Sequence, residues 1–334
     1  MPLFNFSKPQ VAKKVVLAFI VLELFLITFL LLSIVKKTGV ERIIPIPVNK
    51  DDINFNLGSF FKNYYEPKSN SKIVKTIEGK VYSYSINSDS LNENSEYTIK
   101  KDQNVFRIIA LGDSYTFGLY VNTEDNWTAL LESKLNNSLK CKKNKKFEII
   151  NLGVYGYDIQ FSSERFRLRG RKYDPDLVLW FIKKDDLLQI TDLVVENSAI
   201  ITKDNKSISI FKNNNKLFDI NGVLWDEAVI KIHNNVSKKI LLDLQQNSLS
   251  KFKDYYQGRL IIFTFPSLER EFKSLLRDYI GSRDSSYFYD DIIDIQTEPE
   301  LRFRTDPHPN QKGHRAIADN LFQYLTRNKI LSYD

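Results

Sequence analysis

The sequence predicts an α/β protein, a three-layer αβα sandwich around a central, mostly parallel sheet, preceded by one transmembrane helix. The first observation is that, from residue 106 onward, short apolar runs alternate with longer segments of helical periodicity. Strands that alternate with helices form parallel sheets covered on both faces. The second observation is a long apolar run near the N-terminus, which is typical of a membrane-spanning helix.

The apolar runs define a sheet of about five strands with a flavodoxin-like arrangement. The expected strands are 106–112, 147–153, 174–182, 259–266 and 287–295. The expected helices are 122–139, 159–171, 233–256, 268–280 and 312–328. In the last helix, Ile317, Leu321 and Leu325 repeat every four residues and therefore lie on one face.

One segment interrupts this alternation. Residues 188–230 are rich in β-branched and turn residues, so we expect an inserted, β-rich excursion there. Its position between the third strand and the fourth makes it a candidate lid or substrate-selecting wall. The main domain, with this insertion, is expected over residues 106–330.

The N-terminal apolar run covers residues 15–35 and contains one acidic residue, Glu23. At about 1.5 Å per residue, a helix of this length spans the roughly 30 Å of a bilayer's hydrocarbon core. A cleaved signal peptide would have a shorter apolar core and a small-residue cleavage site, and neither is visible. We therefore expect residues 1–36 to form a single-pass anchor with a short flank.

The region after this anchor, residues 37–105, is expected to be a juxtamembrane linker and a β lead-in. Proline residues punctuate its first part, whereas residues 80–86 alternate as in a strand. Lysine and arginine are nearly balanced on the two sides of the anchor, so they do not decide its orientation. Because a short N-terminal flank ordinarily stays inside, we expect the C-terminal domain on the extracytoplasmic side of the membrane.

Composition and charge exclude several classes of function. The net charge is +7, but lysine and arginine are spread along the chain, and the dense run at 140–146 is expected to be a solvated loop. No nucleic-acid-binding module is present, so no nucleic-acid partner is expected. A single cysteine, Cys141, excludes an intrachain disulfide. No glycine-rich phosphate loop appears either, and we expect no cofactor.

A Gly-Asp-Ser sequence follows the first expected strand and includes Ser114. In open parallel sheets, active sites lie at the carboxyl ends of the strands, which makes Ser114 a candidate nucleophile. The same tripeptide is also ordinary turn chemistry. From this stretch alone, both interpretations remain open.

A serine nucleophile needs a base, and the chain has three histidines. His233 lies in a polar stretch and is expected at the surface, and His314 begins the last helix, where it would cap or pack. His308 instead lies in a loop after the fifth strand, two residues from Asp306. This pairing predicts an acid and a base at the sheet edge that carries Ser114. A metal site formed by Asp306, His308 and His314 is not expected, because no further histidine lies nearby.

Four stretches resemble the conserved blocks of the SGNH (GDSL) hydrolase family. "GDSYTFG" (112–118) and "DPHPNQKGH" (306–314) look like the first and last blocks. "NLGVYGYD" (151–158) is similar to the second block, and "LWFIKKDDL" (179–187) resembles the third. The blocks occur in order, each at a strand end, over residues 106–328. Together with the expected anchor, the chain resembles a membrane-anchored bacterial type of this family.

The resemblance implies a role for each matching residue. Ser114 would be the nucleophile, His308 the base, and Asp306 the residue that orients His308. The oxyanion hole would use the backbone N–H groups of Ser114 and Gly156 and a side chain of the third block at Asp185.

The third block departs from the family pattern, because Asp185-Asp186 stands where the family has Asn-Asp. An ionised carboxylate donates no hydrogen bond and repels an oxyanion. Three explanations are open. Asp185 is protonated through burial, or Lys183 or Lys184 turns inward and supplies positive charge, or catalysis is weak or absent.

The expected function is that of a membrane-tethered serine esterase or acyltransferase, acting through an acyl-enzyme on an ester. Acetyl groups of cell-envelope or exported polysaccharide are the substrate that the resemblance suggests. The alternative is a weakly active or inactive domain that binds glycan or a biosynthetic partner.

Overall fold

The computed structural model describes residues 21, 23, 61, 63–139, 146–201, 211–213, 216–220 and 222–331, and the side chains of 139 and 196–224 are not included. The expected anchor at 15–35 therefore lies outside the described residues, apart from Val21 and Glu23, which are helical and exposed. Most of the expected linker before residue 61 lies outside them as well. Of the helices in the described part of the chain, none combines the length and the apolar composition that crossing a bilayer requires.

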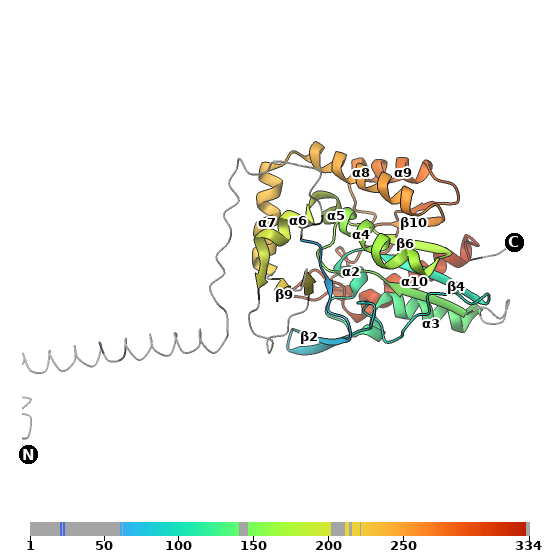
Figure 1. Ribbon diagram of the computed structural model, residues 1–334, viewed down its shortest axis with the longest axis horizontal. Coiled ribbons are helices and arrows are strands. Elements are labelled where there is room, and N and C mark those ends of the chain that lie inside the picture. The colour runs from blue at the N-terminus through green and yellow to red at the C-terminus, as the bar shows by residue number, and fades with distance from the viewer. Residues whose placement is uncertain are drawn as a thin grey trace, which may run out of the picture. The chain divides into compact units, whose positions relative to one another are not determined.

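A five-stranded, wholly parallel sheet forms the centre of the domain (Figure 1). Its strands are β4 (Val105–Leu111), β5 (Lys146–Asn151), β6 (Leu177–Phe181), β10 (Arg259–Phe263) and β11 (Tyr287–Tyr289). The spatial order β5-β4-β6-β10-β11 is the flavodoxin-like order 2-1-3-4-5. The predicted parallel α/β sheet is therefore confirmed, and its topological switch point lies where β4 has β5 on one side and β6 on the other.

Helices cover both faces of this sheet and complete the three layers. On one face lie α3 (Trp127–Leu139) and α10 (Gln311–Arg327), and on the other lie α4 (Ile159–Arg165), α8 (Lys238–Tyr255) and α9 (Arg270–Gly281). Leu131 and Leu321 are buried on the first face, and Phe252 and Leu276 on the second. Figure 1 shows α8 and α9 on the opposite side of the sheet from α3 and α10.

Several predicted elements have different bounds in the structure, among them a helix and a strand whose ends differ by five or six residues. The helix expected at 122–139 begins only at Trp127, after a 3-10 turn over Thr123–Asp125. The strand expected at 287–295 ends at Tyr289. Ile292 and Ile295 beyond it are nevertheless fully buried, so apolar residues of a loop, not of a strand, fill the core at that position.

The inserted segment, expected to be β-rich over 188–230, has helices towards both of its ends. After α5 (Lys184–Leu188) come α6 (Thr191–Ser198), the short strands β7 (Ala199–Ile201), β8 (Phe211–Asn213) and β9 (Lys216–Ile220), and then α7 (Gly222–Asn235). The three strands form a small sheet with β1 (Glu66–Pro67). Ile190, Val194, Ala228 and Ile232 form a buried cluster, and their four-residue spacing is that of a helical stripe.

A β-hairpin precedes the central sheet in the chain. It consists of β2 (Ser71–Ile77) and β3 (Lys80–Ile86), paired antiparallel through a two-residue turn at Glu78–Gly79. The expected strand at 80–86 is thus β3. Tyr84 on its inner face is fully buried, and its ring lies 5.1 Å from that of Phe117, which follows the first strand of the central sheet.

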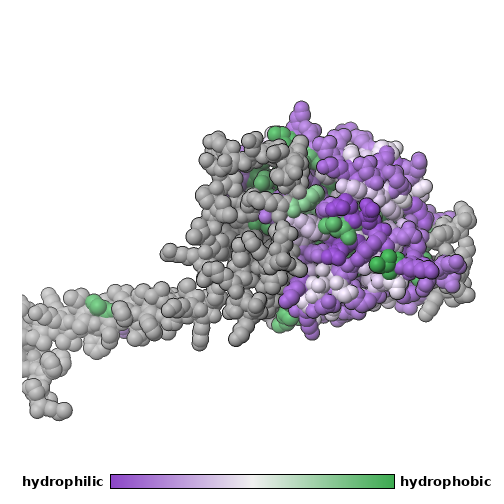
Figure 2. Space-filling view, in the orientation of Figure 1, coloured by the Kyte–Doolittle hydropathy of each residue, from purple (hydrophilic) through white to green (hydrophobic). Residues whose placement is uncertain are grey.

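The described surface in the view of Figure 2 is mainly hydrophilic, with isolated apolar patches. Large apolar side chains that are exposed in the described part of the chain, such as Val81, Ile99 and Leu168, occur singly in the sequence. Scattered exposed apolar residues are normal for a folded domain and mark no interface.

Candidate active site

Ser114 is held in place by a tight turn at the end of β4. Gly112 adopts a φ of 148°, and a Cβ atom at this position would lie 2.3 Å from Thr116 Oγ1 and 3.0 Å from the Phe181 carbonyl oxygen. Asp113 then caps the short helix α2 (Ser114–Phe117) by accepting a hydrogen bond from the Tyr115 N–H at 2.9 Å. Ser114 is therefore both a turn residue and the first helical residue after a buried strand.

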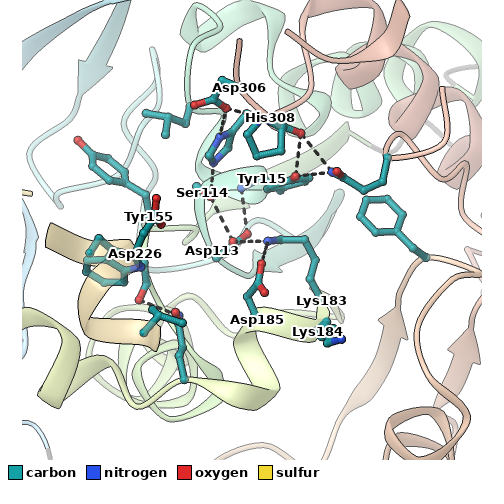
Figure 3. A pocket seen from close by; sticks show the side chains of 18 of the residues that line it. Asp113, Ser114, Tyr115, Tyr155, Lys183, Lys184, Asp185, Asp226, Asp306 and His308 are labelled. Atoms are coloured by element: carbon teal, nitrogen blue, oxygen red, sulfur yellow. Dashed lines mark hydrogen bonds and ion pairs between the residues drawn. The ribbon is translucent and has the colours of Figure 1, made fainter. Parts of the chain in front are cut away.

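The structure brings Ser114, His308 and Asp306 together (Figure 3). His308 Nε2 lies 2.7 Å from Ser114 Oγ, and His308 Nδ1 lies 2.5 Å from Asp306 Oδ1. An ionised carboxylate only accepts hydrogen bonds, so Nδ1 carries the proton and Nε2 is left to accept from the Ser114 hydroxyl. Burial would raise the pKa of Asp306, but the hydrogen bonds from the His308 side chain and backbone outweigh burial and lower it.

Aromatic and amide side chains fix the loop that carries His308. The Tyr115 hydroxyl donates to the Pro307 carbonyl at 2.9 Å, and Gln296 Nε2 donates to the Tyr115 hydroxyl at 2.6 Å. The rings of Tyr115 and Tyr120 lie 5.1 and 5.8 Å from the imidazole of His308. The base is thus held on several sides while its Nε2 stays directed at Ser114.

Ser114 and Gly156 line the same cavity, and the backbone N–H of neither residue has an acceptor among the described residues. The carbonyl of Tyr155, in the same peptide as the Gly156 N–H, accepts a hydrogen bond from the Tyr65 hydroxyl at 2.5 Å. Since the carbonyl and the N–H of a trans peptide point in opposite directions, this bond fixes the direction of the Gly156 N–H. Gly156 has a φ of 77°, and a Cβ there would lie 2.3 Å from the ring of Trp225.

The third block places Lys183, not Asp185, in the interior. The Asp185 side chain is 73% exposed, so its burial, the first explanation for this departure from the family pattern, is not observed. Lys183 is 8% exposed, and its Nζ lies 2.8 Å from Asp113 Oδ2 and 4.0 Å from the centre of the Tyr115 ring (Figure 3). Lys184 instead pairs with Glu269 at the surface. The inward-turned lysine of the second explanation is therefore Lys183.

The Lys183 ammonium forms ion pairs with the buried Asp113 and, at 3.8 Å, with the exposed Asp185. Burial would lower its pKa, but Asp113 and Asp186 outweigh burial and hold the pKa well above its usual range. Asp186 accepts a hydrogen bond from the Lys183 backbone N–H at 2.8 Å, and burial together with the charge of Asp113 raises the pKa of Asp186 well above the ordinary value. Asp113 Oδ2 also lies 3.2 Å from Ser114 Oγ. The buried Lys183–Asp113 ion pair therefore contacts the candidate nucleophile through Asp113.

Ser114 and His308 open into a cavity of about 620 Å³. Aromatic side chains of Tyr120, Tyr155 and Trp225 line its walls. Trp225 comes from α7, so the inserted segment contributes a wall of the cavity. The sequence patterns did not single out Trp225, because a lone tryptophan in a helix is typical of core packing.

The two other histidines lie apart from this arrangement. His233 is exposed, with Nε2 3.0 Å from the Leu188 carbonyl oxygen. His314 is fully buried, and its Nδ1 accepts the Trp127 N–H at 3.2 Å, so it caps the start of α3. Burial and the charge of His308 lower the pKa of His314 to about 3, which keeps its imidazole neutral. In the described part of the chain, no group of three His, Cys, Asp or Glu residues is placed to hold a metal ion.

Comparison with known proteins gives structural neighbours only. No protein-family model matches the sequence, and no curated protein matches it. The similar solved structures include the psychrotrophic esterase EstA from Pseudoalteromonas sp., with 16% identity over 67% of this chain and 98% of that chain and a TM-score of 0.40. A two-domain esterase active on acetylated mannans shares 14% identity over 69% of this chain and 52% of its own, with a TM-score of 0.43.

A further neighbour is a protein of the G-D-S-L family from Desulfitobacterium hafniense DCB-2, with 14% identity over 65% of this chain and 98% of that chain and a TM-score of 0.38. At these values the likeness itself says nothing about substrate. Two of these three neighbours are thus described as esterases and the third as a member of the G-D-S-L family.

Proposed function

We propose that the protein is a membrane-tethered serine esterase or acyltransferase of the SGNH type. The observation that supports this most directly is the hydrogen-bonded chain from Asp306 through His308 to Ser114, with distances of 2.5 and 2.7 Å. Such a chain is the arrangement that activates a serine hydroxyl for attack on an ester. The tether is proposed from the apolar run at residues 15–35.

In the acylation step, Ser114 Oγ forms a bond to the carbonyl carbon of the ester, and the hydroxyl proton passes to His308 Nε2. Asp306 stabilises the imidazolium that results. The tetrahedral intermediate then collapses, the bond to the leaving oxygen breaks, and His308 returns its proton to that oxygen. The alcohol departs, and the acyl group remains bound to Ser114.

Deacylation repeats these steps with a second nucleophile. Water or a sugar hydroxyl gives its proton to His308 Nε2 and attacks the acyl carbon, and Ser114 leaves with the proton returned by His308. Water as acceptor makes the protein an esterase, and a sugar hydroxyl makes it an acyltransferase. We propose acetyl groups of cell-envelope or exported polysaccharide as substrate, because the cavity is open and its aromatic walls can pack against sugar rings.

The oxyanion of each tetrahedral intermediate is proposed to bind the backbone N–H groups of Ser114 and Gly156, which have no acceptor among the described residues. Lys183 is proposed to neutralise Asp113, whose carboxylate would otherwise place an uncompensated negative charge beside Ser114 Oγ. Preorganised donors and charges of this kind are usually the largest contribution to catalysis of acyl transfer. Asp185 lines the cavity and is largely exposed, and its Oδ2 atom lies 3.8 Å from Lys183 Nζ, so solvent and this ammonium both reduce the effect of its charge.

Hydrolysis of p-nitrophenyl acetate by the full-length chain in detergent tests this function, with Asp185→Asn as the informative variant. We expect turnover by the wild type and a change in kcat of less than about threefold in Asp185→Asn, since an exposed charge has a small effect. A many-fold rise in Asp185→Asn would show that Asp185 suppresses the native site, as in the alternative of a weakly active glycan-binding domain. No release of p-nitrophenol by either protein, in water or with an added sugar acceptor, would contradict the proposal.

A further inference from the structure

The turn that joins β2 and β3 has an unexpected residue at its first position. Ile77 pairs with Lys80, so Glu78 and Gly79 form a two-residue loop, and their φ angles are 49° and 75°. Two positive φ values define a type I′ turn, for which Asn, Asp or Gly is strongly preferred at the first position. A glutamate in this left-handed conformation carries a conformational cost, and such outliers cluster at functional sites.

The Glu78 side chain contacts the loop that carries Asp306 and His308. Its Oε1 atom accepts hydrogen bonds from the Arg304 N–H at 2.6 Å, the Thr305 N–H at 3.0 Å and the Thr305 hydroxyl at 3.3 Å. These backbone bonds lower the pKa of Glu78, the bond from Thr305 most of all. One carboxylate oxygen thus holds the two residues that immediately precede Asp306.

The same hairpin also contacts the segment that follows Ser114. The Tyr84 hydroxyl accepts a hydrogen bond from the Tyr120 N–H at 2.6 Å, and its ring packs against Phe117. On the same face of β3, the ring of Tyr82 lies 6.0 Å from that of Phe303. The hairpin therefore touches both of the segments that must meet for His308 to reach Ser114, although these segments are far apart in the sequence.

We propose that Glu78 is a positioning residue of the active site, which holds the 303–308 loop so that His308 Nε2 stays within hydrogen-bonding distance of Ser114 Oγ. This inference rests on the proposed function, because an effect of Glu78 on kcat presupposes that Ser114 and His308 catalyse the reaction. The carboxylate reaches the loop where the shorter side chains that suit a type I′ turn do not. The turn thus carries a glutamate instead of the Asn, Asp or Gly that its conformation favours, at a position from which the carboxylate accepts hydrogen bonds from the loop. Such a departure from local propensity is expected where function requires it.

The decisive variant is Glu78→Asn, because asparagine suits the turn better but is one methylene shorter and uncharged. We expect Tm to be unchanged or higher, while kcat for p-nitrophenyl acetate falls roughly 10- to 100-fold, the scale of a small misplacement of a catalytic group. KM should change by less than about threefold, because Glu78 is remote from bound substrate. If Glu78 contributed only to stability, Glu78→Asn would instead lower Tm and leave kcat unchanged.

Two further variants and one physical measurement complete the test. Glu78→Gln retains an acceptor at the same reach and should recover most of the lost kcat. Lys80→Ala, at an exposed position beside the same turn, should match the wild type. Amide hydrogen exchange of the full-length chain should be faster over residues 303–308 in Glu78→Asn and unchanged in Lys80→Ala.

The outcomes separate this inference from the proposed function. Unchanged kcat in Glu78→Asn, with an active wild type, would overturn the positioning role even if hydrogen exchange became faster. If the wild type itself hydrolyses no ester, the proposed function fails, and hydrogen exchange alone then decides whether Glu78 holds the loop. Unchanged exchange over residues 303–308 would overturn the inference in either case.

Discussion

Replacing Ser114 with alanine is expected to lower kcat for p-nitrophenyl acetate by at least about 10⁴-fold, because the acyl-enzyme can no longer form. His308→Ala should have a similar effect, since His308 Nε2, 2.7 Å from Ser114 Oγ, is the acceptor of the serine proton. The double variant should be little slower than either single variant, because residues that act as one unit are far from additive. Steady-state kinetics of the three variants measure this directly.

Ser267→Ala is the matched control for that experiment. Ser267 lines the same cavity but is exposed, and it belongs to a different loop from Ser114. We expect it to retain nearly all of the wild-type kcat. If Ser114→Ala retained activity comparable to Ser267→Ala, Ser114 would not be the nucleophile, whatever the distances in the site.

The second large effect is expected from Lys183→Met. Methionine fills a similar volume, but it leaves the carboxylate of Asp113 buried without its counter-ion. Removing one partner of a buried ion pair typically costs about 3–5 kcal/mol of stability, and the uncompensated charge beside Ser114 should also lower kcat by roughly 10²-fold or more. Urea denaturation gives the free energy of unfolding, and hydrolysis of p-nitrophenyl acetate gives kcat.

Lys184→Met controls for the loss of a positive charge in the same short segment. Lys184 pairs with Glu269 at the surface, where an ion pair contributes about 0–1 kcal/mol, so its replacement should change neither stability nor kcat appreciably. Adding Asp113→Asn to Lys183→Met should restore part of the lost stability, because the carboxylate that pairs with Lys183 at 2.8 Å is then no longer buried without its counter-ion. Equal effects of the two lysine substitutions would contradict the role assigned to Lys183.

The central sheet could be predicted from the sequence because its strands are short, mainly apolar and separated by segments of helical periodicity. The helices of the inserted segment could not be predicted in the same way, since its β-branched residues suggest strands. Val194 and Ile232 instead lie on helices, because burial against each other at four-residue spacing outweighs their weak intrinsic preference for strands. The strand after α9 was predicted too long for a related reason, as Ile292 and Ile295 are buried without being in a strand.

The proximity of Ser114, His308 and Asp306 could be predicted because the carboxyl ends of parallel strands meet at one edge of the sheet. The sequence could not predict which side chain of the third block points inward, among Lys183, Lys184 and Asp185. The answer depends on the course of the chain after β6 and on the space beside Asp113. The contact of Glu78 with the 303–308 loop joins residues 226 and 227 positions apart, and no local pattern reveals such a contact.

The most direct test of the central claim is the reaction of the full-length chain with a fluorophosphonate, followed by mass spectrometry of its peptides. We expect one phosphonyl adduct, on Ser114, which is absent from Ser114→Ala and forms far more slowly in His308→Ala. Equal labelling of the wild type and Ser114→Ala, or no adduct on Ser114 in a folded wild type, would contradict the claim that His308 and Asp306 activate Ser114 as a nucleophile.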